Sequence, residues 1–414
     1  MKGREFSKAV AGVAWAALMV SGALSLAGEA AVSSRAQEVA GGTNFAVGQV
    51  ASTLLEYREV GYTFVSWSVG INTTSPASKR EPVFKGDSVV RGTLELGRVS
   101  SNEVAFAWDR TARKLYLDLN GNRDLTDDQD GMFSCPKGPM STYSQTFTNI
   151  HLPCRTAHDS RVVLVDLTFY NYGQVCCTAA GRAFWQGKVN LHGEEWQVGL
   201  LWSPGQQRSL LESRDLLLRP WSERNEPFEV NSGSLAAVPF ARMLFVGKHA
   251  YKVKCVNEPQ EAGGKVRMEF AEEQPKLGEL RITGGFVQRA TLEGRPYLIV
   301  LDKPEGIVQV PTGNYSAVKV WLKKGAMEAC LDERTRAAAT RITVTENTTA
   351  TLTVGGPLTN SVALSRQGRR LAMSYQVVGA GGAYRMLNVD LAHPPEFTVY
   401  KGDKKLASGQ FQFG

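Results

Sequence analysis

Short runs in which apolar and polar residues alternate recur along the chain from residue 44 onward. The run 62–69 alternates in this way and is rich in β-branched and aromatic residues, which indicates a strand with one buried face. Residues 88–96 predict another strand by the same pattern. Pairs of runs that face each other across a turn predict hairpins at 103–108 with 114–117, 146–152 with 161–170, 184–191 with 196–202, and 243–246 with 251–256.

The pattern becomes more regular after residue 276. Strands are expected at 279–283, 289–292, 297–301, 308–310, 315–322, 341–345, 350–354, 361–364, 372–378, 385–389 and 397–401. Short strands at intervals of roughly 8–12 residues, with turns between them, predict one β-sandwich or two small ones. The segment 310–315 (Val-Pro-Thr-Gly-Asn-Tyr) resembles a strand corner of secreted Ig-like and transthyretin-like modules, and the resemblance implies a related sandwich.

Two segments have helical features. Residues 206–217 carry leucines at helical spacing before Arg219-Pro220, and 327–339 has a helix-forming composition that could link two sandwich units. Residues 258–264 and 272–275 are charged and rich in turn formers, which predicts a linker. We therefore expect a mostly β, multi-domain chain with a signal peptide (1–27), a flexible leader (28–43), an N-terminal β-rich domain (44–257), a linker (258–275) and a C-terminal Ig-like or transthyretin-like β-sandwich region (276–414).

The first segment has the parts of a secretory signal. Lys2, Arg4 and Lys8 form a basic start, residues 9–26 are apolar and uncharged, and small residues precede a cleavage site after Ala27. The alternative is an uncleaved anchor, because about 18 apolar residues approach the length that spans a bilayer. We favour cleavage because Gly, Ser and Ala make up much of the run. No later stretch is long and apolar enough to span, so we expect a soluble periplasmic or extracellular protein with no membrane contact after cleavage.

Charge adds little to this picture. The formal charge is +7, of which the signal segment contributes +2, so the remainder is near +5. Lysines and arginines are scattered and form no block, which predicts a mixed solvated surface and no nucleic-acid partner.

The chain has six cysteines, and export would permit disulfides. Cys135 and Cys154 form the easiest local pair. Cys176 and Cys177 are adjacent, so on a strand they point to opposite faces and at most one can lie in the core. Buried free thiols are the alternative for several of the six, because a chain of 414 residues can build a core without disulfides.

One segment requires an explanation beyond folding. Its oxygen-bearing side chains fall first at alternate positions and then close together: Asp118, Asn120, Asn122, Asp124, Asp127 and Asp128. Calcium takes six to eight hard oxygen ligands, and this spacing can wrap them around one ion.

The segment Asp118–Asp130 resembles EF-hand-like and dockerin-type calcium loops through its opening Asp-x-Asn-x-Asn. It has Arg123 instead of Gly at the sixth position and Gln129 instead of a bidentate acid at the twelfth, so a nearby carboxylate would have to close the site. We expect flanking strands to make the EF-hand bend at the sixth position unnecessary. The resemblance implies bound calcium. The alternative is an Asn-Gly turn followed by a solvated acidic loop.

Other groups with chemical potential have simpler interpretations. Cys135, His151, Cys154 and His158 are all zinc-ligand types, with a disulfide or plain core residues as the alternative. An exposed row of tryptophans would suit sugar stacking, but burial in the core is the usual role; the residues in question are Trp67, Trp108, Trp185, Trp196, Trp202, Trp221 and Trp321. Glu194 and Glu195 are expected at an exposed turn rather than as a glycosidase pair.

Motifs for serine hydrolases, HExxH metalloproteases, phosphate-binding loops and CxxC redox sites are absent from the sequence. We therefore predict an exported, non-catalytic binding or structural protein of the cell envelope or extracellular space, stabilised by calcium, with a glycan or protein partner. The alternative is a secreted hydrolase whose active site is dispersed in the N-terminal domain. A concave pocket with close carboxylates or a His–carboxylate pair would favour the enzyme, and an exposed aromatic or edge-strand surface would favour binding.

Overall fold

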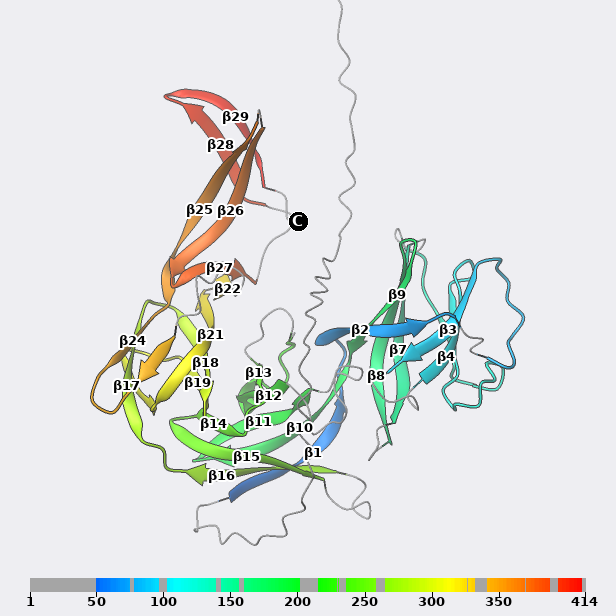
Figure 1. Ribbon diagram of the computed structural model, residues 1–414, viewed down its shortest axis with the longest axis horizontal. Coiled ribbons are helices and arrows are strands. Elements are labelled where there is room, and N and C mark those ends of the chain that lie inside the picture. Colours follow the sequence, from blue (N-terminus) through cyan, green and yellow to red (C-terminus); the bar gives the residue numbers. More distant parts are fainter. Residues whose placement is uncertain are drawn as a thin grey trace, which may run out of the picture. The chain divides into compact units, whose positions relative to one another are not determined.

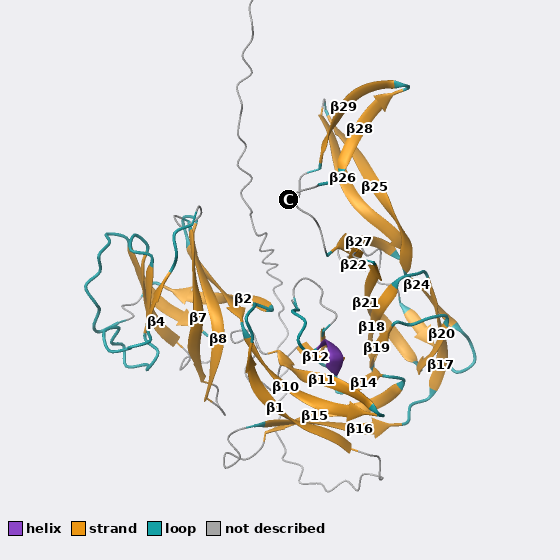
Figure 2. Cartoon of the chain, turned by 180° about the vertical axis from the view of Figure 1, so that it is seen from behind, coloured by secondary structure: helices purple, strands orange, loops and turns teal. Residues whose placement is uncertain are grey.

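The computed structural model describes residues 50–74, 78–96, 103–138, 143–155, 160–201, 215–228, 230, 236–257, 265–325, 327–331, 341–368, 370–387 and 394–411. Strands dominate these residues (Figure 1 and Figure 2), which confirms the prediction of a mostly β protein with several sheets. The described residues all belong to one unit, 47–414. The predicted signal peptide and leader lie outside the described residues.

An eight-stranded sheet forms the first part of the chain, in the order β6-β5-β4-β3-β2-β9-β8-β7. Its strands are β2 (Val65–Asn72), β3 (Val89–Glu95), β4 (Glu103–Asp109), β5 (Lys114–Leu117), β6 (Met132–Ser134), β7 (Ser144–Arg155), β8 (Ser160–Asn171) and β9 (Val175–Gly181). All neighbours are antiparallel, and the predicted β4–β5 and β7–β8 hairpins are present. The aromatic rings of Phe106, Trp108 and Phe169 meet in its core.

A sixteen-stranded sheet follows the order β13-β12-β11-β10-β1-β16-β15-β14-β19-β18-β21-β22-β27-β26-β25, with β23 paired to β21. The first half comprises β1 (Val50–Glu59), β10 (Ala183–Leu191), β11 (Glu194–Leu201), β12 (Asp215–Pro220), β13 (Ala237–Pro239), β14 (Met243–Val246), β15 (His249–Asn257) and β16 (Val266–Glu273). The second half comprises β18 (Val287–Arg295), β19 (Leu298–Asp302), β21 (Gly313–Lys324), β22 (Met327–Leu331), β23 (Ile342–Val344), β25 (Gly355–Gln367), β26 (Arg370–Ala380) and β27 (Gly382–Met386).

A second hydrophobic core lies between part of this sheet and a three-stranded sheet, β20-β17-β24. The small sheet comprises β17 (Leu277–Thr283), β20 (Ile307–Pro311) and β24 (Ala350–Thr353). Leu280 and Leu352 from it pack with Leu292 and Val320, as in a sandwich. At the predicted strand corner, the Tyr315 hydroxyl donates to the backbone oxygen of Pro311 at 2.8 Å. A further hairpin, β28 (Glu396–Lys401) with β29 (Lys404–Gln410), follows.

Three predicted non-strand segments contain strands. The expected linker 258–275 includes β16, which pairs with both β1 and β15. Arg267, Glu269 and Glu273 occupy one face of an amphipathic strand whose other face buries Val266, Met268 and Phe270. The helix expected at 327–339 is wrong for β22, because pairing with β21 and β27 overrides its helical propensity. Likewise, the end of the helix expected at 206–217 belongs to β12, and residues 206–214 lie outside the described residues.

All six cysteines are free thiols, so Cys135 and Cys154, the pair considered easiest to join, form no disulfide, and the alternative of free thiols holds. Cys154 is buried on β7, and burial raises the pKa of its thiol to about 12. The adjacent pair on β9 behaves as alternation predicts, with Cys176 exposed and Cys177 buried. In the part of the chain that the structure describes, no helix has the length and hydrophobicity needed to cross a bilayer.

Candidate functional site

The oxygen-rich loop connects β5 to β6 at the edge of the eight-stranded sheet. Its two ends are tied to the sheet: Asp118 N donates to Ala105 O at 2.9 Å, and Leu117 N donates to Gly131 O at 2.8 Å. In the middle of the loop, Leu125 is buried and anchors it to the protein interior. The sheet therefore gives the loop a rigid base.

Inside the loop, the backbone wraps around its own polar side chains. Asp118 is 3% exposed. Its Oδ1 accepts hydrogen bonds from the backbone of Gly121 (2.9 Å) and Asn122 (3.1 Å), and its Oδ2 accepts one from Arg123 (2.9 Å). The amide oxygen of Asn120 accepts from the Asn122 backbone at 3.0 Å. Alternate Asp and Asn residues therefore define the turns of this loop, as such side chains commonly do.

Arg123 occupies the position where EF-hand loops have glycine. Its φ of 68° lies in the left-handed region that favours glycine. A residue with a Cβ pays about 1 kcal/mol for such a conformation. Hydrogen bonds from the backbone of Lys79 to Arg123 O (2.8 Å) and from Leu125 to Arg80 O (3.0 Å) hold the bend in place.

The acids at the end of the loop are less satisfied. Asp127 accepts from the side-chain amides of Asn120 (3.1 Å) and Asn122 (2.6 Å). Asp128 Oδ1 accepts from the Asn120 backbone at 3.1 Å, but its Oδ2 is buried without a hydrogen-bond partner. Burial, and then the charges of Asp118 and Asp127, raise the pKa of Asp128. A buried carboxylate oxygen facing other acids would be stabilised by a cation.

Asp124 lies apart from this group. Its Oδ1 accepts from the hydroxyl and backbone of Thr126, and its Oδ2 lies 3.6 Å from Arg80 Nη1. The bonds from Thr126 lower the pKa of Asp124, and Arg80 adds to the effect. Among the described residues, no three carboxylates of the loop bring one oxygen each within 4.8 Å of one another. The six predicted residues thus lie in one loop, where Asp128 Oδ2 has no hydrogen-bond partner and Asp124 faces Arg80.

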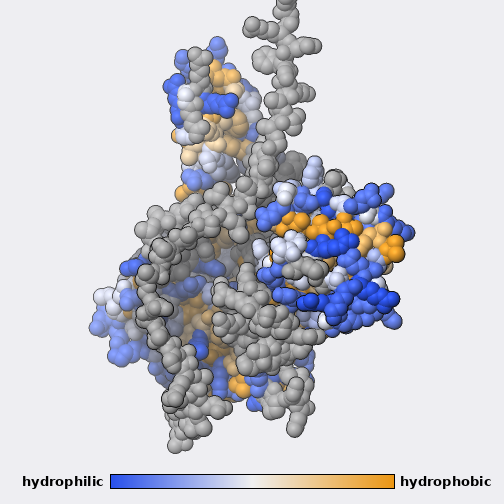
Figure 3. Space-filling model, turned by 45° about the vertical axis from the view of Figure 1, so that its right-hand side comes forward, coloured by the Kyte–Doolittle hydropathy of each residue, from blue (hydrophilic) through white to orange (hydrophobic). Residues whose placement is uncertain are grey.

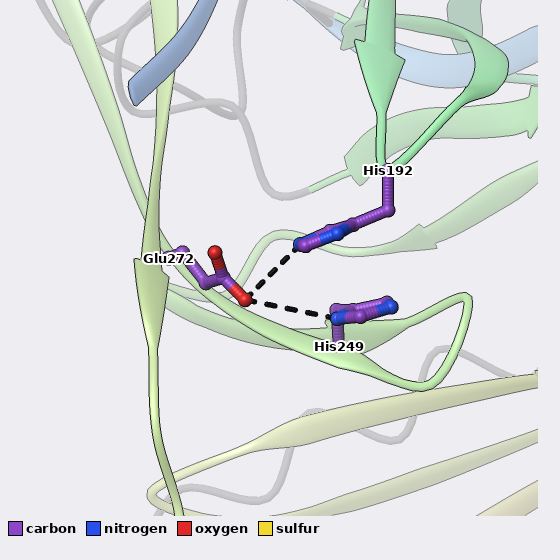
Figure 4. Close-up of side chains that lie close together, drawn as sticks. All are labelled: His192, His249 and Glu272. Atoms are coloured by element: carbon purple, nitrogen blue, oxygen red, sulfur yellow. Dashed lines mark ion pairs between the residues drawn. The ribbon is translucent and has the colours of Figure 1, made fainter. Parts of the chain in front are cut away.

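A second cluster, which we did not predict, joins His192, His249 and Glu272 (Figure 4). His192 Nε2 lies 3.1 Å from Glu272 Oε1, and His249 Nδ1 lies 3.7 Å from the same oxygen. The two imidazole rings are stacked, with centroids 3.4 Å apart and planes inclined by 8°. The side chains are 35%, 36% and 20% exposed in the order named above, so solvent reaches the cluster.

The sheet order explains why these residues meet. His192 forms the turn between β10 and β11, His249 begins β15, and Glu272 lies near the end of β16. Strands β10, β1, β16 and β15 are successive antiparallel neighbours, so the three positions lie at the same end of the sheet. Tyr251 is the cross-strand partner of Glu272. Burial, followed by the charges of Glu272 and Glu194, raises the pKa of its hydroxyl well above the usual range.

The other groups considered from the sequence do not form sites in the described residues. Cys135, His151 and Cys154 form no metal-ligand cluster there, and His158 lies outside the described residues. His151 instead lies 3.2 Å from Glu59. The tryptophans at 67, 108, 185, 196 and 321 are at most 5% exposed and belong to the core, and Trp202 lies outside the described residues. Glu195 pairs with Lys188 at 2.5 Å.

A cleft of about 210 Å³ lies near the start of the β25–β26 hairpin. Its wall is mainly apolar, with Phe286, Leu322, Met327, Leu358, Tyr375 and Met386 among the lining residues. None of the described residues that line the cleft is an acid or a histidine. It therefore lacks the close carboxylates or His–carboxylate pair that would favour a hydrolase.

Comparisons with protein-family models, with curated proteins and with solved structures found no match to this chain.

Proposed function

We propose that this chain is an exported, non-catalytic binding or structural protein of the cell envelope or extracellular space. In this proposal, it binds a protein partner through the β25–β26 hairpin. Calcium stabilises the loop that starts at Asp118. The observation that carries the partner proposal is an exposed apolar face on that hairpin. Export is supported by the signal-like sequence of residues 1–27.

The strand register places the apolar residues of the hairpin on one side. Directly opposed residues share a face, and the register pairs Val362 with Tyr375 and Leu364 with Met373. Leu371 is opposite Arg366 and extends this face toward the tip. Leu364 is 63% exposed, Leu371 is 53% exposed and Val362 is 42% exposed. We call Val362, Leu364, Leu371, Met373 and Tyr375 the hairpin face.

The hairpin face continues into the cleft. Asn360 and Val377 are opposed on the same side of the hairpin and line the cleft together with Tyr375. Small and polar residues, including Ala363 and Ser365, occupy the other side. Figure 3 shows hydrophobic surface among hydrophilic residues in the part at the top of the view, where β25, β26, β28 and β29 lie. An apolar strip that leads into an apolar cleft is typical of a surface that another protein covers.

The edge of the sheet supports the same proposal. β25 is the last strand in the sheet order, and after its start, where Gly356 bridges to Gly285, β26 is its only ladder partner among the described strands. An unpaired strand edge can accept an extended segment of a partner. A protein partner is favoured over a glycan because the hairpin face is aliphatic at its most exposed positions, whereas sugar stacking would use exposed aromatic rings.

The calcium proposal is supported by the wrapped backbone of the loop and by the buried, unpartnered Oδ2 of Asp128. In this proposal, Asp118, Asn120, Asn122, Asp127 and Asp128 would hold the ion, and Asp124 would join them if it left Arg80. Calcium would neutralise the acids and stabilise the loop.

The partner proposal can be tested by placing a photo-crosslinking amino acid at position 364 in cells that produce the full chain. Position 365, on the opposite face of the same strand, is the matched control. We expect an adduct with an envelope or extracellular protein from position 364 and not from 365, and we expect Leu371→Lys to abolish it. Equal adducts from both positions, or none from position 364, would contradict the proposal.

A further inference from the structure

The cluster of His192, His249 and Glu272 combines donors from three separate parts of the chain. None of the three is needed to fill the core, since each side chain is at least 20% exposed. His192 has a φ of 51° and Gly193 a φ of 85°, which is the two-residue hairpin turn that favours Asn-Gly. The turn tolerates a histidine at this position but does not require one.

The spacing of the donor atoms fits one small metal ion. Around a tetrahedral zinc ion with bonds of about 2.0–2.1 Å, neighbouring donor atoms are about 3.4 Å apart. The two distances to Glu272 Oε1, 3.1 and 3.7 Å, lie on either side of this value. All three donor atoms are within 4.8 Å of one another. The imidazole rings would have to tilt from their parallel stack so that both lone pairs point at the ion, and their exposure leaves room for this rotation.

Electrostatics also favours a cation here. Glu194 directly follows the His192-Gly193 turn, so a second carboxylate lies near the cluster. Glu194 Oε2 is 3.4 Å from the position that a Cβ on Gly247 would occupy, which places it beside the turn before His249. A metal ion would share the lone pairs of both rings and offset the charge of the carboxylates.

We propose that His192, His249 and Glu272 form a binding site for a divalent first-row transition metal of the zinc class. Two imidazoles and one carboxylate suit such ions, whereas calcium and magnesium prefer oxygen ligands alone. Three protein ligands leave at least one coordination position open to solvent. This site is separate from the calcium loop and does not depend on the function proposed above.

The test uses the full chain without an affinity tag, with calcium in excess so that any oxygen site is occupied. Titration with Co²⁺, followed by its visible d–d absorption, and calorimetric titration with Zn²⁺ should both show one equivalent bound. His192→Asn keeps a residue that suits the turn, and Glu272→Gln keeps the side-chain volume. Mutation of a residue that only hydrogen-bonds a metal ligand typically weakens metal binding by about 10–100-fold. Loss of a ligand itself should weaken binding at least as much.

His151→Ala is the matched control, because His151 is an exposed histidine that faces only Glu59 among the carboxylates of the described residues. It should leave the affinity unchanged. Melting temperatures in chelator will verify that each variant folds; if one does not, Glu272→Gln carries the test as the most conservative change. Absence of binding by the wild type, or unchanged affinity in His192→Asn and Glu272→Gln, would overturn the proposal.

Discussion

Asp128→Asn separates a calcium site from an ordinary acidic turn, because the two hypotheses give stability changes of opposite sign. Without metal, Asp128 holds a buried oxygen that has no partner and faces the charges of Asp118 and Asp127. Removing its charge should therefore leave the free energy of unfolding unchanged or raise it, by up to about 1 kcal/mol. With calcium present, the same change removes a ligand and should lower the stability.

The size of the calcium effect follows from mass action. Extracellular calcium modules bind with dissociation constants of about 10⁻⁴–10⁻³ M. At about 10 mM calcium, an ion that binds only the folded state then stabilises it by about 1.4–2.7 kcal/mol. A chain of this size should gain roughly 2 °C in melting temperature per kcal/mol, which gives an increase of about 3–5 °C.

Differential scanning fluorimetry in calcium and in chelator measures both effects. The wild type should melt about 3–5 °C higher in calcium. Asp128→Asn should lose most of this increase while melting at the same temperature as the wild type in chelator, or higher. Identical melting of the wild type in both buffers would refute the metal hypothesis. An equal loss of stability by the variant in both buffers would show that Asp128 stabilises the fold directly.

Three further predictions concern Asp128, Arg123 and Leu364. In chelator, the raised pKa of Asp128 means that the folded state binds the carboxyl proton more tightly than the unfolded state does. The resulting contribution to the free energy of unfolding is complete at low pH and is lost as pH rises through the folded pKa. Urea denaturation should show this loss in the wild type and not in Asp128→Asn. Arg123→Gly should raise the free energy of unfolding by up to about 1 kcal/mol, because glycine adopts the left-handed conformation without strain, and an equal or lower value would show that other contacts of Arg123 outweigh it. Leu364→Lys should weaken partner binding by about 10–150-fold in a binding titration, because burial of a leucine contributes about 1.5–3 kcal/mol. Ser365→Lys, on the opposite face of β25, should change the affinity little.

Local pattern was sufficient to predict most strands, because alternation records which face of a strand is buried. The β10–β11 hairpin shows this well: Leu191, Val189 and Trp185 point inward, and the residues between them are more polar. The errors arose where pairing decides the conformation. β16 was taken for a linker because the charged, turn-rich runs 258–264 and 272–275 lie on either side of its apolar positions Val266, Met268 and Phe270.

The loop at Asp118 could be found from the sequence because all of its oxygen donors lie within one short segment. The spacing identified the residues but not the direction of each side chain. The sequence could not show that the carboxylate of Asp124 accepts hydrogen bonds from Thr126 and pairs with Arg80. Nor could it show that one oxygen of Asp128 is buried without a hydrogen-bond partner. Those outcomes depend on the backbone path, including the left-handed bend at Arg123, and on a neighbouring segment that approaches from residues 79–80.

The histidine cluster had no such local signal. His192 and His249 each lie at or next to a tight turn, where a polar residue is expected in any hairpin, so neither is informative alone. They meet because β1 and β16 join the β10–β11 hairpin to the β14–β15 hairpin within one sheet. In the sequence, β1 precedes both hairpins and β16 follows them. Hairpin patterns specify pairing between consecutive strands, but they do not specify which hairpins become neighbours. A site made of residues from such distant strands can be inferred only after the strand order of the sheet is known. Here β16 pairs with both β1 and β15 and so places Glu272 at the same end of the sheet as the two histidines.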